Sequence, residues 1–209
     1  MMETKTIIIV VAVVVAIACI GAVVAIMNNN GGSSDDPIPP EPDFPDLNEK
    51  VLVMYFSATE VTAGVAETIS EYLGCDIVRI EPEVPYTAED LQRDDPNSRV
   101  SKENQDPECR PAIVGDKVDL SNYSTIILGF PIWYHKEPKI IDTFLDAYDL
   151  SGKNMVPFCT SWSAGIGGAM VNIGAAEPGA HVIYGTDFQA GCSDQEVYNW
   201  LDSVGFIKK

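Results

Sequence analysis

The chain is poor in the residues that bind metal ions and nucleic acids. Of its 209 residues only two are histidines, and none of the five cysteines forms a Cys-x-x-Cys pair, so a metal site is not expected. Its 13 basic residues are outnumbered by 31 acidic ones, and the net charge of −18 repels nucleic acid phosphates. The absence of a Gly-x-x-x-x-Gly-Lys-Ser/Thr pattern excludes a Walker phosphate loop. Two interpretations of the acidity stay open: solubility, or steering toward basic protein partners.

One long apolar run stands near the N-terminus. Residues 7–27 contain no charge and no proline. As a helix they would span about 31 Å, close to the hydrocarbon thickness of a bilayer. A secretory signal is the alternative, but its apolar part is shorter, about 7–15 residues. We therefore expect residues 1–27 to be a membrane anchor with one transmembrane helix. Because Lys5 is the only basic residue nearby and acidic residues follow, the positive-inside tendency predicts an extracytoplasmic domain.

The remaining chain divides into a linker and one domain. Residues 28–49 are rich in Asn, Gly, Ser, Asp and Pro, which is typical of a disordered linker. Residues 50–209 are long enough for one well-buried domain. This domain holds four cysteines, which could pair outside the cell, although their spacing identifies no partners: Cys75, Cys109, Cys159 and Cys192. The alternative for Cys159, inside an apolar segment, is a small core residue.

Strand-like and helix-like segments alternate along the domain. Strands are expected from Val51 onward and at residues 76–80, 124–130, 154–160 and 180–185, and helices at 63–73, 138–147, 165–173 and 194–204, the last capped by Ser193. This order predicts a doubly wound α/β fold with a parallel sheet covered on both faces. The long segment 81–120 interrupts the alternation, and we expect it to be an ordered functional loop.

Hydroxyl side chains follow the first strand directly. Ser57, Thr59 and Thr62 lie between this strand and the start of the next helix. A helix start offers unpaired backbone N–H groups and the positive end of the helix dipole, to which the hydroxyls add further donors. The sequence therefore predicts a phosphate site here.

Large aromatic residues and glycines follow the third and fourth strands. Trp133, Tyr134 and Trp162 lie in these loops, and ligands of parallel sheets bind at the carboxyl ends of the strands. The rings could simply cap the edge of the core, but their position beside the phosphate loop favours stacking on a flat aromatic ligand. Gly165 and Gly167 allow backbone to approach a ligand, or alternatively only form a turn. A phosphate and a flat ring system together indicate a mononucleotide, and FMN fits better than ATP.

Longer stretches of the chain resemble one family. The run from Tyr55 to Thr62 resembles the FMN-phosphate loop of flavodoxins. Further stretches resemble a flavodoxin-like family of NAD(P)H-dependent oxidoreductases and quinone-reductase-like flavoproteins: residues 85–91, 97–99, 101–106, 110–113, 129–134, 138, 143–145, 150–153 and 157–161. Together these stretches cover nearly all of residues 50–205.

The resemblance implies a five-stranded parallel sheet of order 2-1-3-4-5 and FMN bound without a covalent link. Tyr86 could reach the flavin edge, or could only fold segment 81–120 back on the sheet, where Arg99 and Arg110 could fix it by pairing with carboxylates. By motif match, the phosphate would be held by Ser57, Thr59, Val61 and Thr62. The flavin ring would be bordered by Pro131, Ile132, Trp133 and Tyr134 on one side and by Thr160, Ser161, Trp162, Gly165 and Gly167 on the other.

Two residues depart from the family pattern. Glu60 stands where the family usually has glycine, and a carboxylate beside a phosphate is unfavourable unless it points to solvent. If the position needs a positive φ, Glu60 also strains the backbone, and FMN affinity is reduced. His135 stands where the family often has a small residue. It is interpreted either as an exposed loop residue or, as the minor alternative, as a proton donor near the flavin.

Three functions are compatible with these features. The first is a membrane-anchored FMN flavoprotein with oxidoreductase activity, which transfers electrons or hydride between NAD(P)H or a redox protein and an acceptor such as a quinone. The second is a tethered flavodoxin-type electron carrier without a substrate of its own, whose acidic surface docks basic redox partners. The third is a binding module with a degenerate flavin site, in which Glu60 marks the loss.

Overall fold

The structure is a computed structural model that describes residues 46–208. The predicted membrane anchor, residues 1–27, and most of the predicted linker lie outside the described residues. Within residues 46–208, no helix has the length and apolarity needed to cross a membrane. The described part corresponds to the predicted domain.

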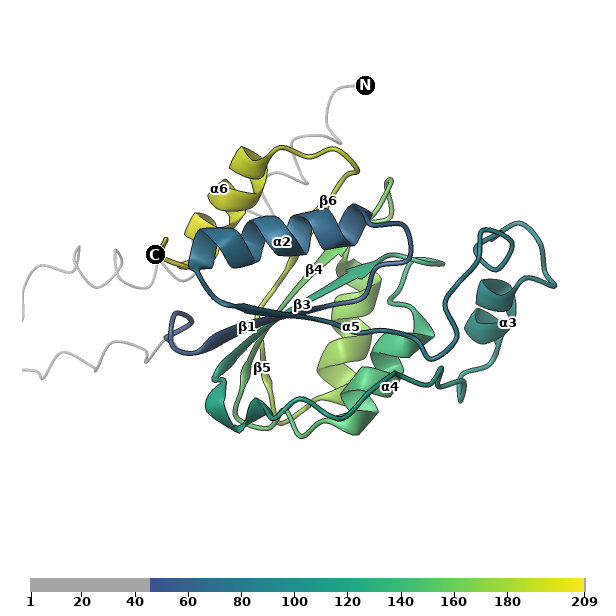
Figure 1. Cartoon of the computed structure of the whole chain (residues 1–209), viewed down its shortest axis with the longest axis horizontal. Coiled ribbons are helices and arrows are strands. Elements are labelled where there is room, and N and C mark those ends of the chain that lie inside the picture. Colours follow the sequence, from purple (N-terminus) through teal and green to yellow (C-terminus); the bar gives the residue numbers. More distant parts are fainter. Residues whose placement is uncertain (1–45, 209) are drawn as a thin grey trace, which may run out of the picture. The chain divides into compact units, whose positions relative to one another are not determined.

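A parallel sheet forms the centre of the domain (Figure 1). Its strand order is β2-β1-β3-β4-β5, and β6 also pairs with β4. This arrangement confirms the predicted order 2-1-3-4-5. The strands are β1 (Val51–Tyr55), β2 (Asp76–Arg79), β3 (Thr125–Pro131), β4 (Asn154–Thr160), β5 (His181–Val182) and β6 (Thr186–Phe188).

The predicted fifth strand, residues 180–185, is shorter in the structure, with β5 at His181–Val182, and β6 begins at Thr186, beyond the predicted end. Pro157 of β4 explains the interruption between them. The carbonyls of Lys153 and Met155 accept hydrogen bonds from the N–H groups of His181 and Ile183, on the β5 side of β4. Every second residue of a strand directs its backbone groups to the same neighbouring strand, so the nitrogen of Pro157 points to that side as well. Proline has no N–H to donate to a neighbouring strand. Beside it, Gly185 passes so close that an added Cβ would lie 1.8 Å from the Pro157 carbonyl oxygen.

Helices cover both faces of the sheet. In Figure 1, α2 (Val61–Leu73) and α6 (Asp194–Val204) lie on one face, while α4 (Lys139–Ala147) and α5 (Gly167–Ala176) lie on the other. The side chains of β1 alternate between two cores, because successive residues of a strand point to opposite faces. Leu52 and Met54 pack into the core that holds α4 and α5, whereas Val51 and Val53 pack into the core that holds α2 and α6.

The C-terminal helix agrees with the sequence prediction in full. α6 spans Asp194–Val204, and the Ser193 side chain accepts from the Glu196 N–H while the Glu196 carboxylate accepts from the Ser193 N–H. The predicted N-cap, Ser193, thus belongs to a capping box with Glu196, which the sequence prediction did not include.

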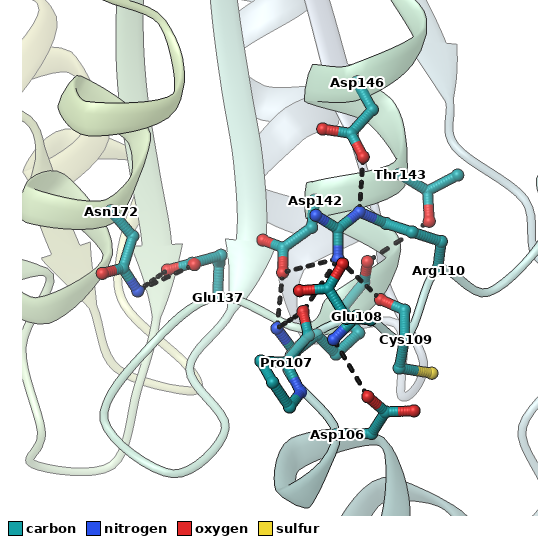
Figure 2. Close-up of polar contacts among 11 residues, drawn as sticks. Asp106, Pro107, Glu108, Cys109, Arg110, Glu137, Asp142, Thr143, Asp146 and Asn172 are labelled. Carbon is teal, nitrogen blue, oxygen red and sulfur yellow. Dashed lines mark hydrogen bonds and ion pairs between the residues drawn. The ribbon is translucent and has the colours of Figure 1, made fainter.

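Segment 81–120 is ordered and contains a helix that periodicity did not predict, α3 (Arg99–Gln105). Arg110 attaches the segment to α4, because its Nε donates to Asp146 at 2.5 Å (Figure 2). Arg99 instead pairs with Glu103 inside α3 at 2.6 Å. The predicted Arg–carboxylate attachment is therefore made by Arg110, while Arg99 stabilises the segment internally.

Candidate functional site

A cavity of about 310 Å³ opens at the carboxyl ends of β1, β3 and β4. We call it the carboxyl-end cavity. Its volume lies at the lower end of the range for small-molecule sites, roughly 300–1,000 Å³. Eight predicted site residues line it: Thr59, Val61, Pro131, Ile132, Trp133, Thr160, Ser161 and Trp162. Ala58, Leu91, Arg93 and Ala190 complete the lining.

The start of α2 lies at the edge of this cavity, because Thr59 and Val61 line it. The first helical residue is Val61, so the N–H groups of the first turn lack partners within the helix. Beneath the loop, the Ser57 side chain is buried, and its Oγ has no hydrogen-bond partner within the described chain. A buried hydroxyl without a partner costs about 1–3 kcal/mol. Unpaired N–H groups and an unpaired hydroxyl together fit the phosphate of FMN.

Thr62 has a supporting position. Its Oγ1 lies 2.7 Å from Oγ1 of Thr160, and both side chains are buried. This contact joins the start of α2 to the end of β4, so it fixes the distance between the two loops that border the cavity. Thr62 does not line the cavity, and its predicted phosphate contact stays a prediction.

Glu60 adopts a left-handed backbone conformation, as expected for a position at which the family usually has glycine. Its φ is 62°, and it is the N-cap residue of α2. Its carboxylate makes no capping hydrogen bond with the helix. Instead, Arg79 of β2 donates to both oxygens, to Oε2 at 3.0 Å and to Oε1 at 2.6 Å. These hydrogen bonds hold the pKa of Glu60 below its ordinary value.

Trp133 forms a rigid wall of the cavity. It packs edge-on against Phe56 and against Tyr86, with ring centroids 5.6 Å and 5.2 Å apart. Trp162, on the opposite loop, is 87% exposed. One aromatic ring is thus fixed by packing, while the other is free to cover a ligand.

Tyr86 lies behind Trp133 and does not line the cavity. Its hydroxyl donates to Glu103 at 2.8 Å, and the Arg99 guanidinium lies 3.8 Å from the centre of its ring. Burial, followed by the charge of Glu103, raises the pKa of Tyr86 well above its ordinary value. These contacts support the alternative in which Tyr86 folds the segment back on the domain.

Tyr134 and His135 form a tight turn beside the cavity. Trp133 and Lys136 exchange backbone hydrogen bonds of 2.9 Å and 3.1 Å, and the two residues between them have φ values of 51° and 65°. This is the backbone pattern of a two-residue hairpin, which normally favours Asn or Gly. The Tyr134 hydroxyl donates to the Arg93 carbonyl at 2.8 Å. His135 is exposed and does not line the cavity, as expected for a loop residue.

Gly165 and Gly167 lie near the cavity without lining it. The Gly165 N–H donates to the Ser161 hydroxyl at 3.3 Å, and Ser161 also donates to Asp187 of β6. Gly168 has the clearest steric role, because an added Cβ would lie 2.1 Å from the His135 carbonyl oxygen. The glycines thus determine the conformation of the loop and do not line the cavity.

Arg93 is the main lining residue that sequence reasoning missed. Among residues 46–208 it is the only charged residue that lines the cavity, and its guanidinium has no ion-pair or hydrogen-bond partner within those residues. The position of segment 81–120 across the carboxyl ends of the strands brings Leu91 and Arg93 to the site. For Leu91 and Arg93, the sequence analysis predicted only that their segment is a functional loop. For Ala190 it predicted no role.

Comparison with known proteins agrees with this geometry. The flavodoxin family matches residues 50–204, whereas no curated protein matches the chain. A provisionally named flavoprotein from Bacteroides uniformis is 38% identical, with 74% of this chain and 98% of that chain covered and a TM-score of 0.71. Another from Bacteroides eggerthii is 37% identical, with 74% and 97% covered and a TM-score of 0.70.

A flavoprotein from Lactobacillus acidophilus in complex with FMN is similar in fold, with 24% identity, 73% and 98% of the two chains covered and a TM-score of 0.58. The family match spans the whole sheet and every loop that lines the cavity. The chain therefore belongs to the flavodoxin family, and its cofactor is FMN, as the sequence predicts.

Proposed function

We propose that this flavoprotein is an oxidoreductase that transfers electrons or hydride between NAD(P)H or a protein donor and an acceptor such as a quinone. The observation that carries the proposal is the buried, unpartnered Ser57 hydroxyl in the loop before α2, beside a cavity that two tryptophans line. A site decayed to a simple binding surface would have no reason to keep a buried hydroxyl without a partner, at a cost of about 1–3 kcal/mol.

FMN supplies the redox chemistry when bound, and the protein orients it and sets its surroundings. The Ser57 hydroxyl and the first-turn N–H groups of α2 would hold the phosphate. Trp133 would border the ring from a fixed position, and the exposed Trp162 would exclude water from its other side. Arg93 adds a positive charge to the cavity, which favours anionic ligands in a chain that is otherwise strongly acidic.

Flavin uptake and turnover test this proposal. The purified full-length chain in detergent is mixed with FMN, freed of unbound flavin by gel filtration, and its absorbance spectrum is recorded. Retained flavin is expected, together with steady oxidation of NADH or NADPH when a quinone is added. A colourless chain that retains no FMN would refute the site, and retained flavin without any nicotinamide oxidation would refute NAD(P)H as the electron donor.

A tethered electron carrier is the second candidate, and the acidic surface favours it. The net charge of −18 suits weak, fast encounters with basic redox proteins. Nicotinamide cofactors are also mainly cytoplasmic, which is a difficulty for the enzyme if the domain lies outside. A carrier would exchange electrons with a basic protein partner at a rate that falls steeply with added salt, and would not oxidise NADH with a quinone.

We also propose that residues 7–27 anchor the protein in the membrane and that the domain is extracytoplasmic. The length of the apolar run supports the anchor, and the single basic residue before it, Lys5, supports the orientation. Protease added to intact cells should then remove the domain. Cleavage only after lysis would contradict the orientation, and recovery of the chain in the fraction without membranes would contradict the anchor.

A further inference from the structure

We propose that Arg79 is a positioning residue for the cofactor phosphate, because it holds the Glu60 carboxylate away from the N–H groups of α2 that the phosphate needs. This inference rests on the proposed FMN site at the start of α2. Glu60 alone would be an obstacle in that site. Paired with Arg79, it becomes a neutral part of the loop.

The geometry shows how one guanidinium holds the loop at two points. Arg79 ends β2 and lies opposite Tyr55 of β1 in the parallel register. Its Nη2 donates to the Ser57 carbonyl at 2.8 Å and to Glu60 Oε1 at 2.6 Å, and its Nη1 donates to Oε2 at 3.0 Å. Arg79 therefore fixes both the residue that carries the unpartnered hydroxyl and the N-cap residue of the helix.

The two Glu60 oxygens are occupied by Arg79 and not by the helix. A polar side chain at a helix N-cap, most often Ser, Thr, Asp or Asn, normally accepts from the N–H groups of the first turn. Glu60 makes no such bond here, so those N–H groups stay available to an anion. Without Arg79, the carboxylate would be free to cap α2 itself, and it would also repel the phosphate. Both effects act against the phosphate and neither acts against the flavin ring.

Riboflavin separates these effects, since it has the same ring system as FMN and lacks the phosphate. Arg79→Met keeps the apolar stem and removes the charge. We expect it to weaken FMN binding by about tenfold, which corresponds to ~1.4 kcal/mol. Riboflavin binding should change by less than about twofold in the same variant. Dissociation constants are measured on the full-length chain, freed of flavin, by the quenching of flavin fluorescence.

Removal of the carboxylate should make Arg79 dispensable. Glu60→Gln alone should bind FMN at least as tightly as the unaltered chain. Glu60→Gln combined with Arg79→Met should return FMN affinity to within about threefold of the unaltered chain, so that the two effects are strongly non-additive. Arg79→Lys, which keeps the charge and loses the planar fork, should lie between Arg79→Met and the unaltered chain.

Lys153→Met controls for the loss of one positive charge that, like Arg79, donates to backbone carbonyls. The Lys153 ammonium lies just before β4 and donates to the Leu120 and Tyr123 carbonyls at 2.8 Å and 2.7 Å. Lys153 does not line the carboxyl-end cavity. This variant should leave the ratio of FMN to riboflavin affinity unchanged.

Several results would overturn the inference. Equal losses of FMN and riboflavin affinity in Arg79→Met would show that Arg79 only stabilises the fold. Unchanged FMN affinity in that variant, or no recovery in the double variant, would show that the pair does not act on the phosphate. If the unaltered chain bound neither flavin, the proposed site itself would fail, and the inference with it. If Arg79→Met did not fold, weaker FMN binding by Glu60→Gln would still refute the inference.

Discussion

Glu137 is a buried acid that should make the domain less stable as the pH rises. It follows the Trp133–Lys136 turn, is only 6% exposed, and accepts from the Asn172 amide of α5 at 2.9 Å (Figure 2). Burial raises its pKa from 4.5 to about 7, and the nearby charge of Asp142 acts in the same direction. Its own backbone N–H and the Asn172 amide favour the charged form, but they do not outweigh burial.

The direction of this pH dependence follows from the number of protons that the folded and unfolded chains bind. Between the ordinary pKa of 4.5 and the folded value of about 7, the folded chain holds a proton on Glu137 that the unfolded chain has released. The free energy of unfolding therefore falls as the pH rises through this window. At about 1.36 kcal/mol for each unit by which the two pKa values differ, the loss amounts to ~3 kcal/mol. The contribution is fully present below the ordinary pKa and is lost above the folded one.

Glu137→Gln isolates this contribution. The amide oxygen of glutamine can still accept from Asn172, and the side chain does not titrate. Urea unfolding of both proteins should show that the advantage of the variant grows by ~3 kcal/mol between about pH 5 and about pH 8. Glu71→Gln, on the exposed side of α2, controls for the loss of one negative charge. Parallel pH profiles for Glu137→Gln and the unaltered chain would refute the reasoning.

Three further changes test the loops around the cavity. Ser57→Ala should stabilise the flavin-free chain by about 1 kcal/mol, because it removes an unpaired buried hydroxyl. The same variant should bind FMN about tenfold more weakly and riboflavin with unchanged affinity. Equal effects on both flavins would contradict a phosphate contact. His135→Gly should raise stability in thermal unfolding by about 1 kcal/mol, since φ is 65° there; a lower melting temperature would show that the imidazole makes a needed contact. Gly168→Ala should cost more than about 2 kcal/mol in urea unfolding, because the added Cβ would meet the His135 carbonyl. Gly174→Ala in the same helix, where nothing lies within 4 Å, is its control.

The sheet and most of its helices were predictable because their signals are local. The buried strands β1, β3 and β4 read as continuous apolar runs, and α6 carries its own capping box. The interruption between β5 and β6 was not predicted, although Pro157 stands in the sequence. The proline breaks pairing only on the side toward which residue 157 directs its nitrogen, and that side is fixed by the register of the whole sheet.

The candidate site likewise contains a part that local sequence signals predict and a part that depends on tertiary contacts. The loops after β1, β3 and β4 were predicted because the carboxyl ends of parallel strands meet at one edge. Arg93 was missed because no local pattern places it there. Its segment is held at the cavity by tertiary contacts, such as the Tyr134 hydroxyl to the Arg93 carbonyl and the Arg110 pair with α4. Such contacts join residues far apart in the sequence, and a single sequence does not reveal them.

At Glu60, the sequence predicted the departure from the family pattern but not the contact that compensates for it. The departure from glycine was visible, and so were its two consequences, a positive φ and a misplaced charge. Its compensation was not visible, because Arg79 reaches Glu60 only through the pairing of β2 with β1, which places Arg79 opposite Tyr55. A slip of one residue in that pairing would turn the guanidinium to the other face of the sheet. The charge balance of the phosphate loop thus depends on strand register, and any substitution that shifts β2 should weaken FMN binding more than riboflavin binding.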